Sequence, residues 1–130
     1  MTIEGLSEKA EQLLRQVHPV QFTVDGGPSS AAFRPNRSDE GLLSTRREHI
    51  GAERAYTEWV VSHESAGTWG ITVGDVDDAS LRAFDDSTEP GQPEGHASVD
   101  FTGLTNGAKV KSSRKLRERA VEGGCLHPPA

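Results

Sequence analysis

GAERAYTEWVVSHESAGTWGITV, residues 51–73, contains the two clearest secondary-structure signals of the chain. Residues 51–63 place apolar side chains at steps of three and four, which is the spacing of one face of a helix. The small residues at 65–67 end that pattern. Residues 69–73 then alternate large apolar side chains with glycine and threonine, as a strand with one buried face does. The stretch therefore predicts a helix at 51–63 and a strand at 69–73, which we expect at the centre of a sheet.

Weaker patterns on both sides of this stretch predict further helices and strands. Helical spacing covers residues 7–17 and stops before Pro19, and strand-like alternation covers 20–24. A polar, turn-rich loop is expected at 29–41, with a short strand at 31–34. The remaining expected elements are a short strand at 41–45, a short helix at 76–84, a strand at 97–101, a helix at 106–122 and a brief edge strand at 125–127. This mixed order predicts an α+β fold, with about three helices packed on a short mixed or antiparallel sheet.

Length and composition predict one domain located in the cytoplasm. The chain has 130 residues, the usual size of a single domain, and 33% of them are hydrophobic. Its one cysteine excludes an intramolecular disulfide, and the sequence shows neither a signal-peptide pattern nor an apolar run long enough for a bilayer. Residues 85–95 are acidic and rich in proline and glycine, a composition that buries too little to offset the entropy of ordering. We expect a single domain over residues 1–130, with a mobile loop at 85–95 and no membrane contact.

The charges are unevenly distributed along the sequence. Residues 109–119 contain six cations opposed by Glu118 alone and carry a net charge of +5, whereas the whole chain carries −6. These cations are Lys109, Lys111, Arg114, Lys115, Arg117 and Arg119. Steps of three and four place several of them on one helix face, and such a strip can bind phosphates, nucleic acid or an acidic protein surface. The members of the strip are Lys111, Arg114, Lys115 and Arg119. The alternative is an ordinary solvated face, paired with Asp85, Asp86, Glu89 and Glu94.

A polar row follows the predicted strand at 97–101. Residues on one side of a strand alternate, so His96, Ser98, Asp100 and Thr102 share a face. If this row faces a cleft, His96 can act as a general base that Asp100 orients. If the row faces water, it is the ordinary exterior of an antiparallel strand, and this is the interpretation that we favour.

The loop at 29–41 contains arginines beside small hydroxyl residues. Arg34 and Arg37 can hold a phosphate or a carboxylate through convergent donors. The loop matches no glycine-rich phosphate-binding motif. The alternative is a solvated loop in which Asp39 pairs with one of these arginines.

We expect no metal site and no cofactor. The five histidines show no paired helical spacing, and no Cys-x-x-Cys motif accompanies them. Cys125 is expected to be a buried structural thiol, because nothing near it in sequence would make it a nucleophile. Trp59 and Trp69 lie on the apolar faces of their predicted elements, so both are expected in the core.

These observations lead to one preferred function and two alternatives. We expect a small accessory or regulatory protein that binds an anionic partner, either a protein or a ligand, through its basic C-terminal helix. The first alternative is a small transferase or hydrolase acting on a nucleotide-like or other phosphorylated substrate. In it, Arg34 or Arg37 holds the anionic group while His96 transfers a proton and Asp100 positions His96. The second alternative is a nucleic-acid-binding module, which the overall negative charge disfavours. The oligomeric state is left open.

Overall fold

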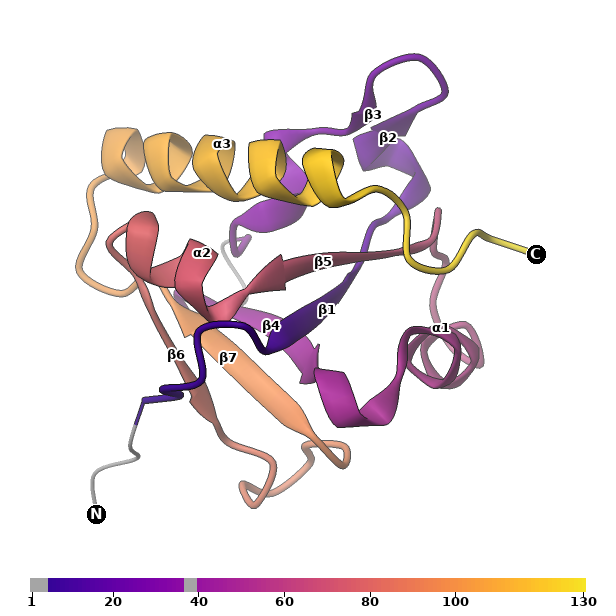
Figure 1. Cartoon of the computed structure of the whole chain (residues 1–130), viewed down its shortest axis with the longest axis horizontal. Helices are drawn as coiled ribbons and strands as arrows, with labels where there is room; N and C mark the ends of the chain where they lie inside the picture. Colours follow the sequence, from indigo (N-terminus) through magenta and orange to yellow (C-terminus); the bar gives the residue numbers. More distant parts are fainter. Residues whose placement is uncertain (1–4, 37–39) are drawn as a thin grey trace.

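A five-stranded antiparallel sheet with helices on both faces organises the chain, shown in Figure 1 as a computed structural model that describes residues 5–36 and 40–130. In spatial order the strands are β5 (Thr68–Thr72), β1 (Gln12–Gln16), β4 (Leu42–Arg47), β7 (His96–Asp100) and β6 (Arg82–Asp85). A separate hairpin pairs β2 (Phe22–Thr23) with β3 (Gly27–Pro28). The helices are α1 (Ala52–Trp59), α2 (Val73–Asp78) and α3 (Asn106–Gly123). The predicted α+β fold is confirmed.

The main core lies between the sheet and the long helix α3. It contains side chains from every strand of the large sheet, together with Phe33, Val76, Leu116 and Ala120 from the helices and turns that cover this face. Phe33 belongs to a short 3-10 turn, Ser30–Phe33, that packs beside α3. Figure 1 shows α2 and α3 on this side of the sheet and α1 on the other.

A smaller apolar cluster forms on the opposite face under α1. It consists of Leu14, Ile50 and Ala55, with Leu126 packed against it. Because successive side chains of a strand point to opposite faces, Leu14 joins this cluster while its neighbour Leu13 joins the main core. Strand β1 is therefore buried on both sides.

This two-sided burial explains why the predicted helix at 7–17 is wrong. The residues form a turn at 9–10 followed by β1, which pairs with β5 and β4. A strand that is covered on both faces needs consecutive apolar residues and loses the alternation that identifies a strand. The pair Leu13 and Leu14 then matches a helical spacing equally well.

The region after β5 also differs from the expectation. Thr72 caps α2, since its hydroxyl accepts a hydrogen bond from the Asp75 amide while the Asp75 carboxylate accepts one from the Thr72 amide. This capping box starts a helix at Val73, the residue expected to end the strand. Ser80, with φ of 62°, then turns the chain into β6, so the helix predicted at 76–84 covers the end of α2 and most of a strand. Strand β5 is an edge strand and not the central one.

Two of the other predicted strands differ from the structure, and four further predicted elements are confirmed. Residues 20–24 form the end of a 3-10 turn and β2, and the short strand expected at 31–34 is the 3-10 turn described above. The strands expected at 41–45 and 97–101 are confirmed as β4 and β7, within one or two residues. The helices expected at 51–63 and 106–122 are confirmed as α1, which ends at Trp59, and α3.

Both edges of the large sheet are partly covered by the ends of the described chain. Gly5 forms a β-bridge with Phe84 on β6, and His127 forms one with Thr68 on β5. The edge strand expected at 125–127 is thus reduced to a single bridge. Such cover limits pairing of exposed edges with other chains. Within residues 5–36 and 40–130, no helix has both the length and the apolar character needed to cross a bilayer.

Candidate functional site

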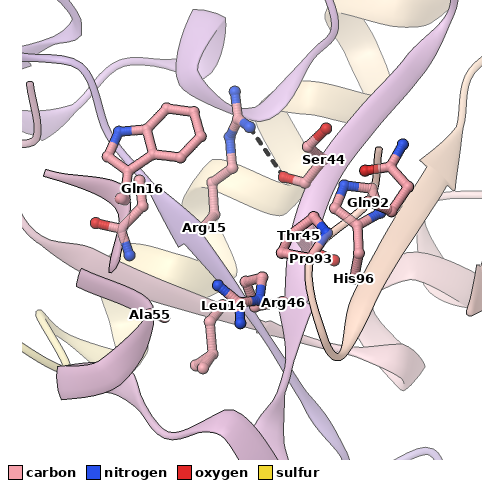
Figure 2. Close-up of a pocket in the computed structure, with 11 residues that line it drawn as sticks. Leu14, Arg15, Gln16, Ser44, Thr45, Arg46, Ala55, Gln92, Pro93 and His96 are labelled. Carbon is pink, nitrogen blue, oxygen red and sulfur yellow. Dashed lines mark hydrogen bonds between the residues drawn. The ribbon is translucent and has the colours of Figure 1, made fainter. Parts of the chain in front are cut away.

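The large sheet splits between β1 and β4, and a cavity lies at the split. The two strands pair through two positions, Leu13 with Arg47 and Leu14 with Arg46. Beyond them the Arg15 side chain occupies the gap: its Nη1 donates to the Ser44 carbonyl at 2.9 Å (Figure 2). An arginine side chain thus replaces main-chain pairing at this point.

The cavity has a volume of about 160 Å³, is partly open to solvent and is lined by three parts of the chain. The sheet supplies Leu14, Arg15, Gln16, Ser44, Thr45, Arg46 and His96; α1 supplies Ala55 and Trp59; the loop before β7 supplies Gln92 and Pro93. An engineered protein cavity of about 150 Å³ binds benzene, so this one can hold a compact group of similar size.

His96 belongs to a buried polar cluster at the edge of the cavity. Its Nδ1 lies 2.5 Å from Asp86 Oδ1, and the Ser98 hydroxyl donates to Asp86 Oδ2 at 2.6 Å. The exposed fraction is 4% for both His96 and Asp86 and 1% for Ser98. A carboxylate only accepts hydrogen bonds, so Asp86 holds the His96 proton on Nδ1 and leaves the Nε2 lone pair available.

The predicted polar row is only partly correct. Asp100 accepts hydrogen bonds from the amide and hydroxyl of Thr102, at 2.8 and 2.5 Å, and not from His96. The favoured interpretation, a row facing water, is wrong for His96 and Ser98, because the loop that carries Asp86 covers them. Sequence reasoning missed Asp86 since it belongs to an acidic segment with no periodic pattern, ten residues before its partner.

Arg46 and α1 form an ionic network beside the cavity. Arg46 Nη2 donates to Glu58 at 2.9 Å, and Arg54 donates to both Glu58 and Glu94. Hydrogen bonds from Arg54, and from Arg46 in the case of Glu58, lower the pKa of both carboxyl groups, and these bonds in turn raise the pKa of Arg54. The network joins α1 to the loop before β7, which is the same loop that contributes Gln92 and Pro93.

The acidic loop is therefore bound to the domain at several points. Asp85 ends β6 and pairs with Arg47, which also binds Glu11 through two nitrogens at 2.7 Å. Burial raises the pKa of Asp85, but hydrogen bonds from Ser87 and Arg47 outweigh this effect, so the pKa is lowered overall. The Arg47 hydrogen bond likewise lowers the pKa of Glu11. Mobility of residues 87–95 stays a prediction, whereas Asp85 and Asp86 have defined partners.

Three carboxylates of the acidic segment have partners other than α3. Asp85, Asp86 and Glu94 pair with Arg47, His96 and Arg54 respectively. The alternative interpretation, in which these acids pair with the C-terminal helix, is thus wrong for the three carboxylates.

Of the six cations of α3, two are held by neighbouring groups, three others are exposed, and Lys109 is half-buried. Arg117 donates to the Pro28 and Gly26 carbonyls, and Arg119 lies 3.9 Å from Asp75 and 3.5 Å from Glu122. In contrast, Lys111, Arg114 and Lys115 are exposed and have no carboxylate partner among the described residues, although Lys115 donates to the Asp78 carbonyl at 3.3 Å. We call these three residues the α3 basic surface. They line one hollow along the helix together with Val110 and Glu118.

Arg34 lies beside α3 and not beside His96. Its Nη1 lies 3.2 Å from the hydroxyls of Ser30 and Ser113, and Ser113 is on α3. Ala97 belongs to the core under α3, so its neighbour His96 projects from the other face of the sheet. The structure thus places Arg34 at the buried side of α3 and separates it from the cavity. Arg37 and Asp39 lie outside the described residues.

The other residues singled out in the sequence are Cys125, Trp59, Trp69 and the possible metal ligands. Among the described residues, no group of three or more histidine, cysteine or acidic side chains is arranged to hold a metal ion. Cys125 is exposed, contrary to expectation, although partial burial raises the pKa of its thiol. Trp69 is in the core as expected, while Trp59 is half-buried and stacks on His63 with ring centres 3.9 Å apart.

Comparisons of this chain with protein-family models, with curated proteins and with solved structures give no match.

Proposed function

We propose that this protein is a small accessory or regulatory protein of the cytoplasm that binds an acidic partner protein through the α3 basic surface. The observation that carries the proposal is the exposure of Lys111, Arg114 and Lys115 on one helix without carboxylate partners among the described residues. Cations that are already paired contribute little to a new contact, because binding first requires the existing pairs to break.

The position of α3 supports this role. Its apolar side packs on the sheet through Leu116 and Ala120, so the cations project from a fixed helix. Fixed positions reduce the entropy that a partner must overcome on binding.

The charge of the rest of the chain favours a protein over a nucleic acid. The whole chain carries −6, and Glu118 lies within the hollow that the three cations line. A long polyanion meets repulsion beyond the contact, whereas a short acidic segment of a protein touches only the cations.

The experiment measures fluorescence anisotropy of a labelled poly-L-glutamate peptide and of a single-stranded oligonucleotide of matched charge. We expect the peptide to bind more tightly than the oligonucleotide, with an affinity that falls as salt is added. Replacing all three residues of the α3 basic surface with glutamine should weaken peptide binding about tenfold, since each exposed ion pair contributes about 0.2–1 kcal/mol.

A control variant changes the net charge equally at other exposed positions. Val20→Glu, Val61→Glu and Thr88→Glu combined also lower the charge by three, because each adds one carboxylate at an exposed site. This variant should bind the peptide nearly as well as the wild type. Equal weakening in both variants would show that overall charge and not this surface governs binding. Tighter binding of the oligonucleotide would contradict the proposal and would indicate that the partner is a nucleic acid and not an acidic protein.

A further inference from the structure

We propose that the cavity at the split between β1 and β4 binds a small α-hydroxy carboxylate with a compact apolar body. In this arrangement Arg46 Nη1 donates to the carboxylate, and the hydroxyl donates to His96 Nε2. The cavity lies on the face of the sheet opposite α3, so the inference is independent of the function proposed above.

Arg46 and His96 are direct partners in the pairing of β4 with β7. Side chains that face each other across antiparallel strands have Cβ atoms about 4.5–5.5 Å apart. Both residues line the cavity, and Figure 2 shows them with Pro93 and Gln92 around the same space. The two polar groups can therefore contact neighbouring atoms of one small molecule.

Arg46 and His96 are each fixed by hydrogen bonds to the protein, and each has one side-chain nitrogen without a hydrogen bond within the described part of the chain. Arg46 donates from Nε to the Glu94 carbonyl at 2.8 Å and from Nη2 to Glu58 at 2.9 Å. His96 is held through Nδ1 by Asp86. Arg46 Nη1 and His96 Nε2 form no hydrogen bond with the described residues.

These two nitrogens are not among the buried polar atoms that lack a hydrogen-bond partner. Among the described residues, Trp69 Nε1 is the one buried side-chain nitrogen or oxygen without a hydrogen-bond partner. The free nitrogens of Arg46 and His96 are therefore reached by solvent, and a ligand in the cavity can replace that solvent. A held donor and a held acceptor bind a ligand with little loss of side-chain entropy.

The chemistry of the two nitrogens selects the ligand. Guanidinium groups bind carboxylates well, and Arg46 supplies one. Arg15 also lines the cavity, but its guanidinium donates to the Ala32 and Ser44 carbonyls. Among the described residues that line the cavity, none is aspartate or glutamate. With its proton on Nδ1, His96 offers an acceptor at Nε2, which a hydroxyl next to the carboxylate satisfies.

The remaining lining limits the size of the ligand. Leu14 and Ala55 supply apolar surface, and the ring of Trp59 and Pro93 extend it. A volume of about 160 Å³ accommodates a branched alkyl group or a single ring and excludes a nucleotide.

The test measures chemical-shift changes of the 130-residue protein by two-dimensional NMR during titration with α-hydroxyisovalerate. Two related compounds separate the contributions: isovalerate lacks the hydroxyl, and α-hydroxyisovaleramide lacks the charge. We expect saturable binding of α-hydroxyisovalerate and at least tenfold weaker binding of each of the others, because each leaves one of the two nitrogens without its partner. Absence of saturable binding, or equal binding of all three compounds, would overturn the proposal without a variant being needed.

Two variants locate the site. In His96→Asn the shorter amide can still donate to Asp86 but has no group at the Nε2 position, so binding should fall at least tenfold. Ala55→Leu should block the cavity from α1 without altering a polar group, and Ala52→Leu, on the same helix outside the cavity lining, is its control. If Ala55→Leu binds α-hydroxyisovalerate as tightly as Ala52→Leu does, the ligand occupies another place and the assignment is wrong.

Discussion

Replacing Asp86 with alanine should remove a large fraction of the folding free energy. Asp86 accepts hydrogen bonds of 2.5 Å from His96 and 2.6 Å from Ser98, and all three side chains are buried. A hydrogen bond to a charged group contributes about 1.5–3 kcal/mol. Loss of both bonds should cost about 3–6 kcal/mol, compared with a total stability of about 5–15 kcal/mol for a typical domain.

Asparagine at the same position provides the matched comparison. The amide has nearly the same shape, its oxygen can accept from Ser98, and its NH₂ group can donate to His96 Nδ1. The histidine proton must then move to Nε2. Because both hydrogen bonds persist without the charge, Asp86→Asn should cost only about half as much, roughly 1.5–3 kcal/mol.

Urea denaturation measures both effects. With a slope of about 1.5 kcal/mol per M, the alanine variant should unfold at a midpoint lower by about 2–4 M and the asparagine variant by about 1–2 M. ¹⁵N NMR of His96 should show the proton on Nδ1 in the wild type and on Nε2 in Asp86→Asn. An alanine variant within about 0.5 M of the wild-type midpoint would refute the reasoning, as would equal losses in the two variants.

Three further outcomes are expected. Glu11 and Asp85, the two carboxyl partners of Arg47, have pKa values lowered from 4.5 and 3.8 respectively. Their contribution to stability is therefore present above those values and is lost as the pH falls below them. Arg47→Met should make the urea midpoint depend less on pH in this acid range. Gly95→Ala places a Cβ at 2.6 Å from Ile50 at a φ of +69° and should cost about 1–3 kcal/mol more than Gly91→Ala, which has φ of +84° and open space, as compared by urea denaturation. Arg117→Ala removes two hydrogen bonds to the β2–β3 hairpin and should speed amide exchange there while exchange in β7 is unchanged.

Burial on two faces decided which elements could be recognised in advance. Helices α1 and α3 were predictable because each has one apolar face, which leaves a period of three to four residues in the sequence. Strand β7 keeps its alternation, since Ala97 and Val99 enter the main core while polar residues occupy the other face. Strand β1 lost that signal because Leu13 and Leu14 serve different clusters.

The same distinction applies to the candidate residues. The cations of α3 could be identified from the sequence, because a helix face follows from spacing alone. Their availability could not, since the partners of Arg117 come from the β2–β3 hairpin and one partner of Arg119, Asp75, comes from α2. His96 was recognisable as a candidate, but the sequence pointed to Asp100 on the same strand as its partner, whereas the structure pairs it with Asp86.

The sequence by itself determined the α+β class, the helices α1 and α3, the strands β4 and β7, and the concentration of positive charge near the C-terminus, because each depends on residues a few positions apart. Only the tertiary structure decided that Asp86 meets His96, that Arg15 fills the split in the sheet and that Arg34 belongs with α3. These contacts join residues separated by 10, 29 and 79 positions. They depend on strand order and on the face from which each side chain projects, and neither is encoded in a local pattern.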